Sequence, residues 1–378
     1  MPDRSVGTAS AAGGGSREVG RIRELLRAMA RRRVDPFLCT HPANIRYLTG
    51  FSGSDAALLV SGDAVTLVTD GRYREQARLE VRGAEVVITD RKWGEIARRI
   101  RKAERSRGTG RSRRTGFESQ ALPVATFRRL ARNHGRGWVP LAGLVEAFRM
   151  RKDEGELRAM EAAAIVASGA LLQVLERGMR GLREGEVAAR LAFGMRMQGA
   201  DGESFRAIVA SGPRSAMPHA VPTEARIGRG DPVLIDLGAR RLGYCSDETV
   251  TILPERPRGG LSRIHDAVRR AQEAGIRAVR PGVLCREVDA RVRESLDRSG
   301  LLKYFVHSTG HGVGLEIHER PSVSMRSPDR LAEGMVITVE PGVYIPGLGG
   351  VRIEDMVRVT DSGRERMTYL PKSGRLAA

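Results

Sequence analysis

Acidic residues interrupt strand-like apolar runs at four places in the C-terminal half of this 378-residue chain, and they restrict its fold more than any other feature. Asp is depleted from strands, and a buried carboxylate without a partner is costly. Two carboxylates that share one site also repel each other unless a cation lies between them. The fold therefore has to gather these acids around a cation, or give each of them an arginine or a turn to cap.

The first two acids lie in the segment DPVLIDLGARRLGYCSDETVTIL, residues 231–253. VLIDLGA and YCSDETVTI are strand-like, and RRLG between them predicts a turn. In such a hairpin, Asp236 and Asp247 come close together on paired strands. The alternative is that one of them caps a turn or pairs with one of the chain's many arginines.

The second pair of acids repeats this arrangement in GMVITVEPGVYIPGLGGVRIEDMVRVT, residues 334–360. Glu340 ends the first strand-like run and Glu354 lies within the second, with a Gly- and Pro-rich turn between the runs. Four carboxylates on two hairpins, together with a histidine, predict a pair of sites for hard divalent metals. Two such ions close together can clamp one bridging hydroxide and polarise a carbonyl group.

Three of the chain's seven histidines fall within HSTGHGVGLEIHE, residues 307–319. His311 lies between two glycines, which allow the backbone to approach a ligand closely. The glycines do not indicate a nucleotide-binding loop, because the strand–turn–helix context is missing. For His318 the alternative to a cleft residue is a packed core histidine, and for His307 it is part of a packed strand.

In their order and spacing, these residues resemble the pita-bread metallopeptidases, and within them the Xaa-Pro aminopeptidase and prolidase branch. The metal motifs of that branch are similar to IDLGARRLGYCSDETVT, GHGVGLEIHE and VITVEPGVYIPGLGGVRIED. A further active-site histidine of the family corresponds to His219 in SGPRSAMPHAVPTEARIGRGD. The creatinase-type N-terminal domain is less specifically similar to NIRYLTGFSGSDAALLV and TLVTDGRYREQA.

The resemblance implies an α/β (α+β) fold, with a creatinase-like N-terminal α/β domain followed by a pita-bread catalytic domain of two pseudo-twofold α/β halves. We place a disordered tail at residues 1–18, the N-terminal domain at 19–147 and the catalytic domain at 148–378. A weak repeat, GLREGEVAAR (181–190) and GVLCREVDAR (282–291), agrees with duplicated halves, although two matches this short can also be coincidence.

Local patterns predict the helices and strands of the N-terminal domain. Short apolar runs bounded by turn residues predict strands at PFLCT, NIRYLTGF, AALLVSG, AVTLVTD and AEVVITD. Helical spacing predicts helices at Arg21–Arg33, GEIARRIRKAERSR and VATFRRLARNHG, and a long helical region after Arg149. The basic segment Arg101–Gly116 predicts an exposed loop.

The resemblance also implies a role for each candidate ligand. Asp236 chelates one metal ion, and His311 and Glu340 hold the other. Asp247 and Glu354 bridge both ions. The cofactors are then two divalent metal ions, with Mn²⁺ as the first choice and Co²⁺, Zn²⁺ or Fe²⁺ as alternatives.

The implied activity is hydrolysis of the Xaa-Pro bond at the N-terminus of peptides, an Xaa-Pro aminopeptidase reaction with a metal-bridging hydroxide as nucleophile. His219 and His318 would hold the substrate in the cleft, and Glu340 would pass a proton to the leaving nitrogen. Arg352 would steady the carboxylates that bind metal. The substrate is a peptide with proline at its second position, and a homodimer is implied by the resemblance alone.

Two departures from the family pattern are present. Val250 stands where the family often has an arginine that is not a ligand. Ser322 stands four residues after His318, where strict prolidases often carry an arginine that meets the carboxylate of a dipeptide. Ser322 favours longer peptides, but Arg320 or Arg326 could replace that arginine, so a prolidase (Xaa-Pro dipeptidase) is the alternative. A non-catalytic pita-bread binding protein is a more distant alternative, because such proteins typically lose ligands.

Composition argues against several other classes of protein. The net charge is +19, but the arginines are mixed with acids and aromatic residues make up only 4%, so nucleic-acid binding is not expected. Three widely spaced cysteines form neither a disulfide framework nor a Cys-x-x-Cys zinc motif. The N-terminal residues lack the apolar core of a secretory signal, and no run of about 18 apolar residues predicts a membrane span. We therefore expect a cytoplasmic protein that binds neither nucleic acid nor membrane.

Overall fold

The computed structural model describes residues 14–62, 64–105, 114–132 and 137–374. The chain folds as two compact units, Met1–Phe148 and Arg149–Ala378. The first contains the predicted N-terminal α/β domain and the second contains all of the predicted ligands.

The N-terminal unit is built on a six-stranded mixed sheet. Its strands are β1 (Val34–Cys39), β2 (Ala56–Val60), β3 (Val65–Thr69), β4 (Glu85–Ile88), β5 (Arg114–Glu118) and β6 (Trp138–Leu141). Their order in the sheet is β4-β3-β2-β1-β5-β6. The pairs β1–β2 and β2–β3 are antiparallel, whereas β3–β4, β1–β5 and β5–β6 are parallel.

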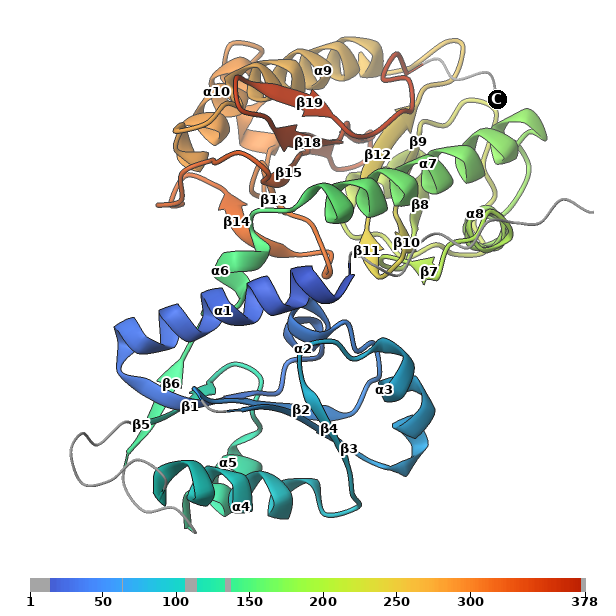
Figure 1. Cartoon of the computed structure of the whole chain (residues 1–378). Coiled ribbons are helices and arrows are strands. Elements are labelled where there is room, and N and C mark those ends of the chain that lie inside the picture. The colour runs from blue at the N-terminus through green and yellow to red at the C-terminus, as the bar shows by residue number, and fades with distance from the viewer. Residues whose placement is uncertain (1–13, 63, 106–113, 133–136, 375–378) are drawn as a thin grey trace, which may run out of the picture. The chain divides into compact units, whose positions relative to one another are not determined.

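Helices cover both faces of this sheet. They are α1 (Gly14–Arg32), α2 (Pro42–Thr49), α3 (Arg74–Glu80), α4 (Lys92–Arg105) and α5 (Val124–Arg132), with a 3₁₀ turn at Gly71–Tyr73 and a short α6 at Glu146–Arg149. Figure 1 shows α1 on one face of the sheet and α4 with α5 on the other. Ile96 and Ile100 of α4 and Leu130 of α5 pack against Leu59 and Phe117 of the sheet in one buried core.

One prediction for this unit was wrong, because NIRYLTGF is not a strand but contains most of helix α2. Pro42 occupies the first turn of that helix, where its missing N–H costs nothing. At the same end, the Glu118 carboxylate accepts hydrogen bonds from the backbone N–H of Thr40 (2.6 Å) and of His41 (2.7 Å). A carboxylate is favourable at a helix N-terminus. The helix therefore depends on a residue 77 positions further along the chain than His41, which a local pattern does not contain.

Two other predicted segments differ at their ends from the structure. Helix α1 begins at Gly14, so residues 14–18 of the predicted tail are helical and the rest of that tail lies outside the described residues. The basic segment predicted as a loop belongs to α4 as far as Arg105 and to β5 from Arg114. The residues between them lie outside the described residues.

The catalytic unit repeats one arrangement twice, a pair of helices followed by strands, which confirms the prediction of two α/β halves. The first half comprises α7 (Glu154–Glu176), α8 (Glu184–Met197), β7 (Gly202–Glu203), β8 (Ile208–Ser211), β9 (Val233–Leu237), β10 (Ala239–Arg241), β11 (Tyr244–Cys245) and β12 (Glu248–Ile252). The second comprises α9 (Leu261–Ala278), α10 (Cys285–Asp297), β13 (Gly310–Gly312), β14 (Glu319–Val323), β15 (Val336–Val339), β16 (Gly342–Ile345), β17 (Gly349–Arg352), β18 (Asp355–Val359) and β19 (Arg364–Arg366). Two 3₁₀ turns lie at Gly212–Ala216 and Leu302–Tyr304.

The weak sequence repeat falls at equivalent places in the two halves. Each copy begins at a glycine with positive φ, Gly181 at 82° and Gly282 at 84°, a conformation that glycine adopts without strain. Each then runs into the second helix of its pair, α8 or α10. The repeat is therefore a structural one, and coincidence is not needed to explain it.

Each predicted hairpin consists of an outer pair of strands and an inner pair of strands that lies between them in the sequence. In the first half, β9 pairs with β12 while β10 and β11 between them pair with each other and join β7 in another sheet. In the second half, β15 pairs with β18 while β16 and β17 form a separate two-stranded sheet. In the first half, the chain passes from the sheet of β9 to the sheet of β10 at Gly238, where an added Cβ would collide with the carbonyl oxygen of Ser246.

Each half also has its own hydrophobic core. One core joins α7 and α8 to β8, β9 and β12, and it includes Val250, so the position where the family often has arginine is a packing position here. The other joins α9 and α10 to β15, β17 and β18. Helix α7 is apolar and long enough to cross a membrane by length and composition alone, but 61% of its most apolar window is buried in the structure. That burial is typical of a core helix.

Candidate active site

One cleft in the catalytic unit, with a volume of about 570 Å³, brings together every predicted site residue. A cavity of this size accommodates a small peptide. Its wall includes the predicted ligands Asp236, Asp247, His311, Glu340 and Glu354, the predicted cleft residues His219, His318 and Arg352, and also His307 and Ser322.

The acids reach this cleft from the outer strands of the nested hairpins. Asp236 lies on β9, and Asp247 directly precedes β12, the antiparallel partner of β9. Glu340 directly follows β15, and Glu354 directly precedes β18, the antiparallel partner of β15. Each half therefore contributes one acid from each of two paired strands, as the sequence predicts.

His311 is the central residue of the three-residue strand β13. An added Cβ at Gly310 would collide with the carbonyl oxygen of Thr338, and one at Gly312 with that of Arg320. The two glycines are therefore required by neighbouring strands, and not by a ligand as the sequence suggested. They allow β13 to fit between β14 and β15, with the imidazole of His311 against Asp247 and Glu340.

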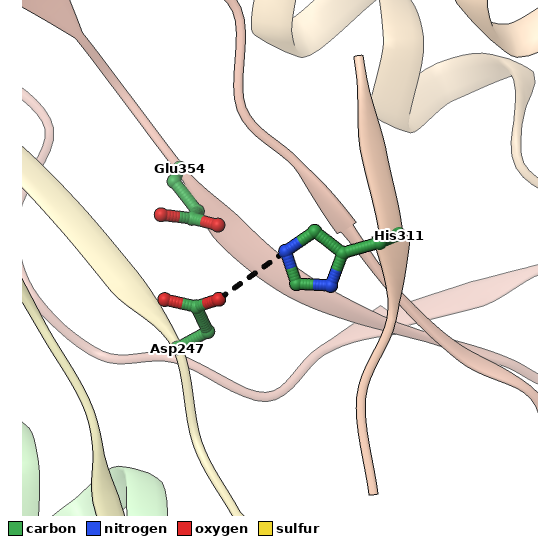
Figure 2. A group of neighbouring side chains, drawn as sticks. All are labelled: Asp247, His311 and Glu354. Carbon is green, nitrogen blue, oxygen red and sulfur yellow. Dashed lines mark ion pairs between the residues drawn. The ribbon is translucent and has the colours of Figure 1, made fainter. Parts of the chain in front are cut away.

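The hydrogen bonds of the His311 ring define its tautomer. Nδ1 lies 3.0 Å from the carbonyl oxygen of Gly312, so Nδ1 carries the hydrogen and Nε2 carries the lone pair. Nε2 in turn lies 3.5 Å from Asp247 Oδ2 and 3.4 Å from Glu340 Oε1. Figure 2 shows Asp247 and Glu354 pointing toward this nitrogen, and one ligand atom of each of the three residues lies within 4.8 Å of the others. Acceptors that face one another in this way call for a cation between them.

Burial and mutual repulsion raise the pKa of three acids in the metal-free site, Asp247, Glu340 and Glu354. Burial raises the pKa of Asp247 well above its usual range, and the charges of Glu354 and Asp236 add to the shift. Burial likewise raises the pKa of Glu354, again helped by neighbouring carboxylates. The pKa of Glu340 rises to about 7 for the same main reason. Burial lowers the pKa of His311 to about 4, so its ring is neutral and able to bind metal at neutral pH.

Asp236 and Arg352 are neighbours in the wall of the cleft. Arg352 Nη2 donates a hydrogen bond of 2.5 Å to Asp236 Oδ2. The other oxygen, Oδ1, is buried and has no hydrogen-bond partner among the described residues. Buried polar atoms are rarely left in that state, so Asp236 has one oxygen held in place and one free to bind a cation.

The donor set fits divalent metal ions. It offers carboxylate oxygens and one neutral imidazole, which suits Mn²⁺, Co²⁺, Fe²⁺ or Zn²⁺. An ion bonded at about 2.0–2.2 Å to each ligand can join the His311 nitrogen to carboxylate oxygens 3.4 Å and 3.5 Å away. The lone pair of His311 and the unpaired oxygen of Asp236 show that both ends of the cluster have an unused ligand atom.

Three further histidines lie around this cluster. The ring of His318 meets that of His311 edge to face, with 4.4 Å between the ring centroids. His307, which the sequence left open as packing, lines the cleft together with His219. His307 Nδ1 is 2.8 Å from the Ser308 carbonyl oxygen and so carries the hydrogen, while Nε2 lies 2.9 Å from the hydroxyl of Tyr344.

Tyr344 is a residue that sequence analysis missed. Its hydroxyl accepts a hydrogen bond of 2.8 Å from Arg352 Nη1 and, given the tautomer of His307, donates to His307 Nε2. A chain of hydrogen bonds thus runs from Asp236 through Arg352 and Tyr344 to His307. The signal available in the sequence was only the tyrosine's place in the turn between the two glutamates, which does not predict this contact.

Two buried carboxylates anchor the loops that carry the cleft histidines. Glu184 accepts hydrogen bonds from the N–H groups of Ser211 (2.8 Å) and Thr223 (3.1 Å), which flank the loop of His219. Glu319, next to His318, is paired with Arg149 and lies 3.4 Å from Lys152 Nζ. Neither carboxylate lines the cleft, so both act on the site through the loops they hold.

A doubled α/β fold whose cleft gathers four acids and one neutral histidine defines a metal-dependent hydrolase. Comparison with known proteins agrees. The description "Metallopeptidase family M24" matches residues 158–361, and "Creatinase/Prolidase N-terminal domain" matches residues 21–151. The chain therefore belongs to metallopeptidase family M24 and is a metallopeptidase with a creatinase-type N-terminal domain.

Individual relatives match over nearly their whole length. The Xaa-Pro dipeptidase of Pyrococcus furiosus is 36% identical over 349 residues, which are 92% of this chain and 97% of the relative. The solved Xaa-Pro dipeptidase from Bacillus anthracis has a TM-score of 0.87 at 38% identity, covering 95% of this chain and 98% of its own. The solved X-Pro aminopeptidase from Thermotoga maritima has a TM-score of 0.85 at 34% identity, covering 93% of this chain and 98% of its own.

These names bear on the specificity predicted from Ser322. Most of the similar proteins are named as dipeptidases, so the comparisons support the family and favour the prolidase alternative over the aminopeptidase. The arginines considered as substitutes for the missing one are not in place: neither Arg320 nor Arg326 lines the cleft. Arg320 Nη2 is instead 2.5 Å from Asp329 Oδ1.

Proposed function

We propose that this protein is a dinuclear-metal Xaa-Pro dipeptidase, a prolidase that hydrolyses the bond before proline in a dipeptide. The observation that carries the proposal is the cluster of Asp247, His311 and Glu354, with Glu340 beside the same imidazole nitrogen and a free oxygen of Asp236 in the same cleft. The names of the similar proteins support the choice of a dipeptide substrate.

The ligands divide between two divalent ions, for which we propose Mn²⁺, with Co²⁺, Zn²⁺ and Fe²⁺ as alternatives. Asp236 would bind one ion, His311 and Glu340 the other, and Asp247 and Glu354 both. The bound ions would supply an activated water and a Lewis acid for the peptide carbonyl group. The chain's own residues then have to bind, orient and protonate the substrate.

Those tasks fall to the residues around the cluster. His219 and His318, both exposed on the cleft wall, would donate hydrogen bonds to the substrate as charge develops on the carbonyl oxygen. Glu340 would hand a proton to the leaving proline nitrogen. Arg352 would hold Asp236 in its orientation through the 2.5 Å hydrogen bond to Oδ2.

A second candidate is an Xaa-Pro aminopeptidase that acts on longer peptides. Ser322 favours it, because Ser322 lines the cleft where strict prolidases often have an arginine. The likeness to the X-Pro aminopeptidase from Thermotoga maritima supports it as well. A non-catalytic binding protein is disfavoured, because the ligand set is complete.

Hydrolysis of Ala-Pro and Ala-Pro-Pro by the purified protein, with added Mn²⁺ and after chelation, tests the two candidates. Metal-dependent cleavage of Ala-Pro with little cleavage of the tripeptide is the expected result. Release of alanine mainly from the tripeptide would favour the aminopeptidase. The homodimer and the cytoplasmic location stay predictions, and sedimentation of the metal-loaded protein tests the first.

A further inference from the structure

The charge of the cleft sets a problem for the substrate of the proposed function. The four carboxylates on its wall would balance the charge of the two divalent ions, so the carboxylate at the C-terminus of a dipeptide, next to the proline ring, still needs a cationic partner. Among the described residues, the arginines that line the cleft are Arg206 and Arg352, and the lining contains no lysine. These two are the first candidates for the dipeptide's carboxylate, because a guanidinium can bind a carboxylate through two parallel hydrogen bonds.

Arg352 is already fully engaged. Its side chain is 4% exposed, and its guanidinium donates to Asp236, to the Tyr344 hydroxyl and to the Pro218 carbonyl oxygen. Turning it toward a substrate would break these bonds and leave Asp236 without its partner. Arg352 is therefore a part of the framework of the site.

Arg206 is placed differently. It is exposed, lines the cleft, and forms no ion pair or side-chain hydrogen bond with any residue that the structure describes. It lies two residues before β8, and Ile208, the first residue of β8, is paired in the sheet with Asp236. Arg206 thus stands beside the metal-binding strands with its charge free. A charged guanidinium with an open fork of donors is suited to bidentate binding of a carboxylate.

The side chains next to Arg206 suit the rest of the substrate. Phe205 and Ile208 line the same cleft, and both are apolar. The proline of an Xaa-Pro dipeptide carries its carboxylate on the carbon adjacent to the ring nitrogen. A group that binds this carboxylate therefore needs an apolar surface beside it for the ring, and the segment 205–208 offers both.

We propose that Arg206 binds the C-terminal carboxylate of the dipeptide and so determines the preference for dipeptides, in a chain that has Ser322 where strict prolidases often carry an arginine. The inference rests on the proposed function, since it assumes that the cleft hydrolyses Xaa-Pro bonds. It names a specificity-determining residue on the first half of the catalytic unit, whereas position 322 lies on the second.

The test compares Ala-Pro with Ala-Pro amide, which lacks only the carboxylate charge, in the metal-loaded protein and in Arg206→Met. In the variant, kcat/KM for Ala-Pro should fall about 10- to 100-fold, the loss of a hydrogen-bonded charge pair, mainly through a higher KM. The preference for Ala-Pro over its amide should fall by the same factor. Arg206→Lys, which keeps a point charge, should recover part of the preference.

A matched control is Arg229→Met, because Arg229 is an exposed arginine that does not line the cleft. It should retain the wild-type preference, and both variants should bind metal as the wild type does. Equal losses on acid and amide in Arg206→Met, or no loss on either, would overturn the role of Arg206. If the metal-loaded wild type cleaves neither substrate, the proposed function itself is rejected.

Discussion

Thr249 and Glu354 join the two halves of the catalytic unit at the metal cluster. Thr249 Oγ1 donates a hydrogen bond of 2.5 Å to Glu354 Oε2, and the N–H of Glu354 donates to the Thr249 carbonyl oxygen at 3.1 Å. Thr249 also lies opposite Asp236 in the pairing of β12 with β9. One small side chain therefore fixes Glu354, a candidate ligand of the second half, against the strands of the first half that carry the candidate ligands Asp236 and Asp247.

Thr249→Val should weaken metal binding with little effect on the fold. The substitution removes the hydroxyl that holds Glu354 Oε2 and keeps the branched shape of the side chain. Partners that orient a metal ligand are typically worth about 10- to 100-fold in metal affinity, and we expect a loss in this range. Competition with a metal-sensitive dye would measure it. Thr249→Ser retains the hydroxyl and should bind metal as the wild type does; an unchanged affinity in Thr249→Val would contradict the prediction.

Asp247→Ala should have a larger effect, because Asp247 is proposed to contact both ions. Metal content should fall below the two ions per chain that the proposal requires. Loss of a residue that only orients a ligand typically costs about 10- to 100-fold, and the fall in kcat/KM should be larger than that. Elemental analysis of the dialysed protein checks the first and dipeptide hydrolysis the second. Glu333→Ala, at an exposed glutamate away from the cleft, is the control. Full metal content with substantial turnover in Asp247→Ala would show that Asp247 is not a metal ligand.

The meeting of the acids in one cleft could be predicted from the sequence because its signals are local. Asp236 and Glu340 stand out as acids in apolar strands, and hairpins with short turns bring such residues together. The nesting of the hairpins was not predictable in this way, since the change of sheet at Gly238 depends on the Ser246 carbonyl oxygen. Helix α2 was mistaken for a strand because the carboxylate that stabilises its N-terminus, on Glu118, is distant in the sequence.

Metal binding should weaken as the pH falls below about 7. In the metal-free protein Glu340 has a pKa of about 7, raised mainly by burial, so below that pH a proton competes with the ion for it. His311, with a pKa of about 4, is already neutral and adds no competing proton near neutral pH. Each competing proton lowers the apparent affinity about 10-fold per pH unit.

Calorimetry in buffers of different ionisation enthalpy measures this effect as released protons. At pH 6 we expect at least one proton per chain to leave when metal binds, and fewer at pH 8.5. Glu340→Gln should release fewer protons at pH 6, because its amide does not titrate. Proton release that does not change between the two pH values would show that Glu340 is already ionised in the metal-free cleft.

His318→Ala should separate metal binding from catalysis. The ring of His318 touches that of His311 but is not part of the ligand cluster. The variant should keep its metal content and lose kcat by about 100- to 1000-fold, the usual loss for a donor that stabilises a developing oxyanion. Steady-state kinetics with parallel metal analysis provides the measurement. Loss of metal in this variant would mean that the ring supports His311 and does not act on the substrate.

Lys372 should stabilise the two segments that carry Asp247 and Glu354. Glu248 and Asp355 directly follow Asp247 and Glu354, the two residues proposed to contact both ions, and both are buried away from the cleft. Lys372 Nζ lies 2.6 Å from Glu248 Oε1 and 3.3 Å from Asp355 Oδ1, so one ammonium group serves the two carboxylates. This lysine near the end of the chain therefore connects β12 of one half with β18 of the other.

Lys372→Met should lower the free energy of unfolding by about 3–5 kcal/mol, the usual loss when one partner of a buried ion pair is removed. The methionine fills a similar volume, so the loss reports Glu248 left without its cation and Asp355 left with only Arg366, whose Nε is 3.6 Å from Oδ2. Urea unfolding of the metal-free protein measures it, and Lys303→Met, at an exposed lysine, should change stability by less than about 0.5 kcal/mol. Equal stabilities of the two variants would mean that Glu248 and Asp355 are satisfied without Lys372, by the Leu370 N–H and the Gln272 amide that also donate to them.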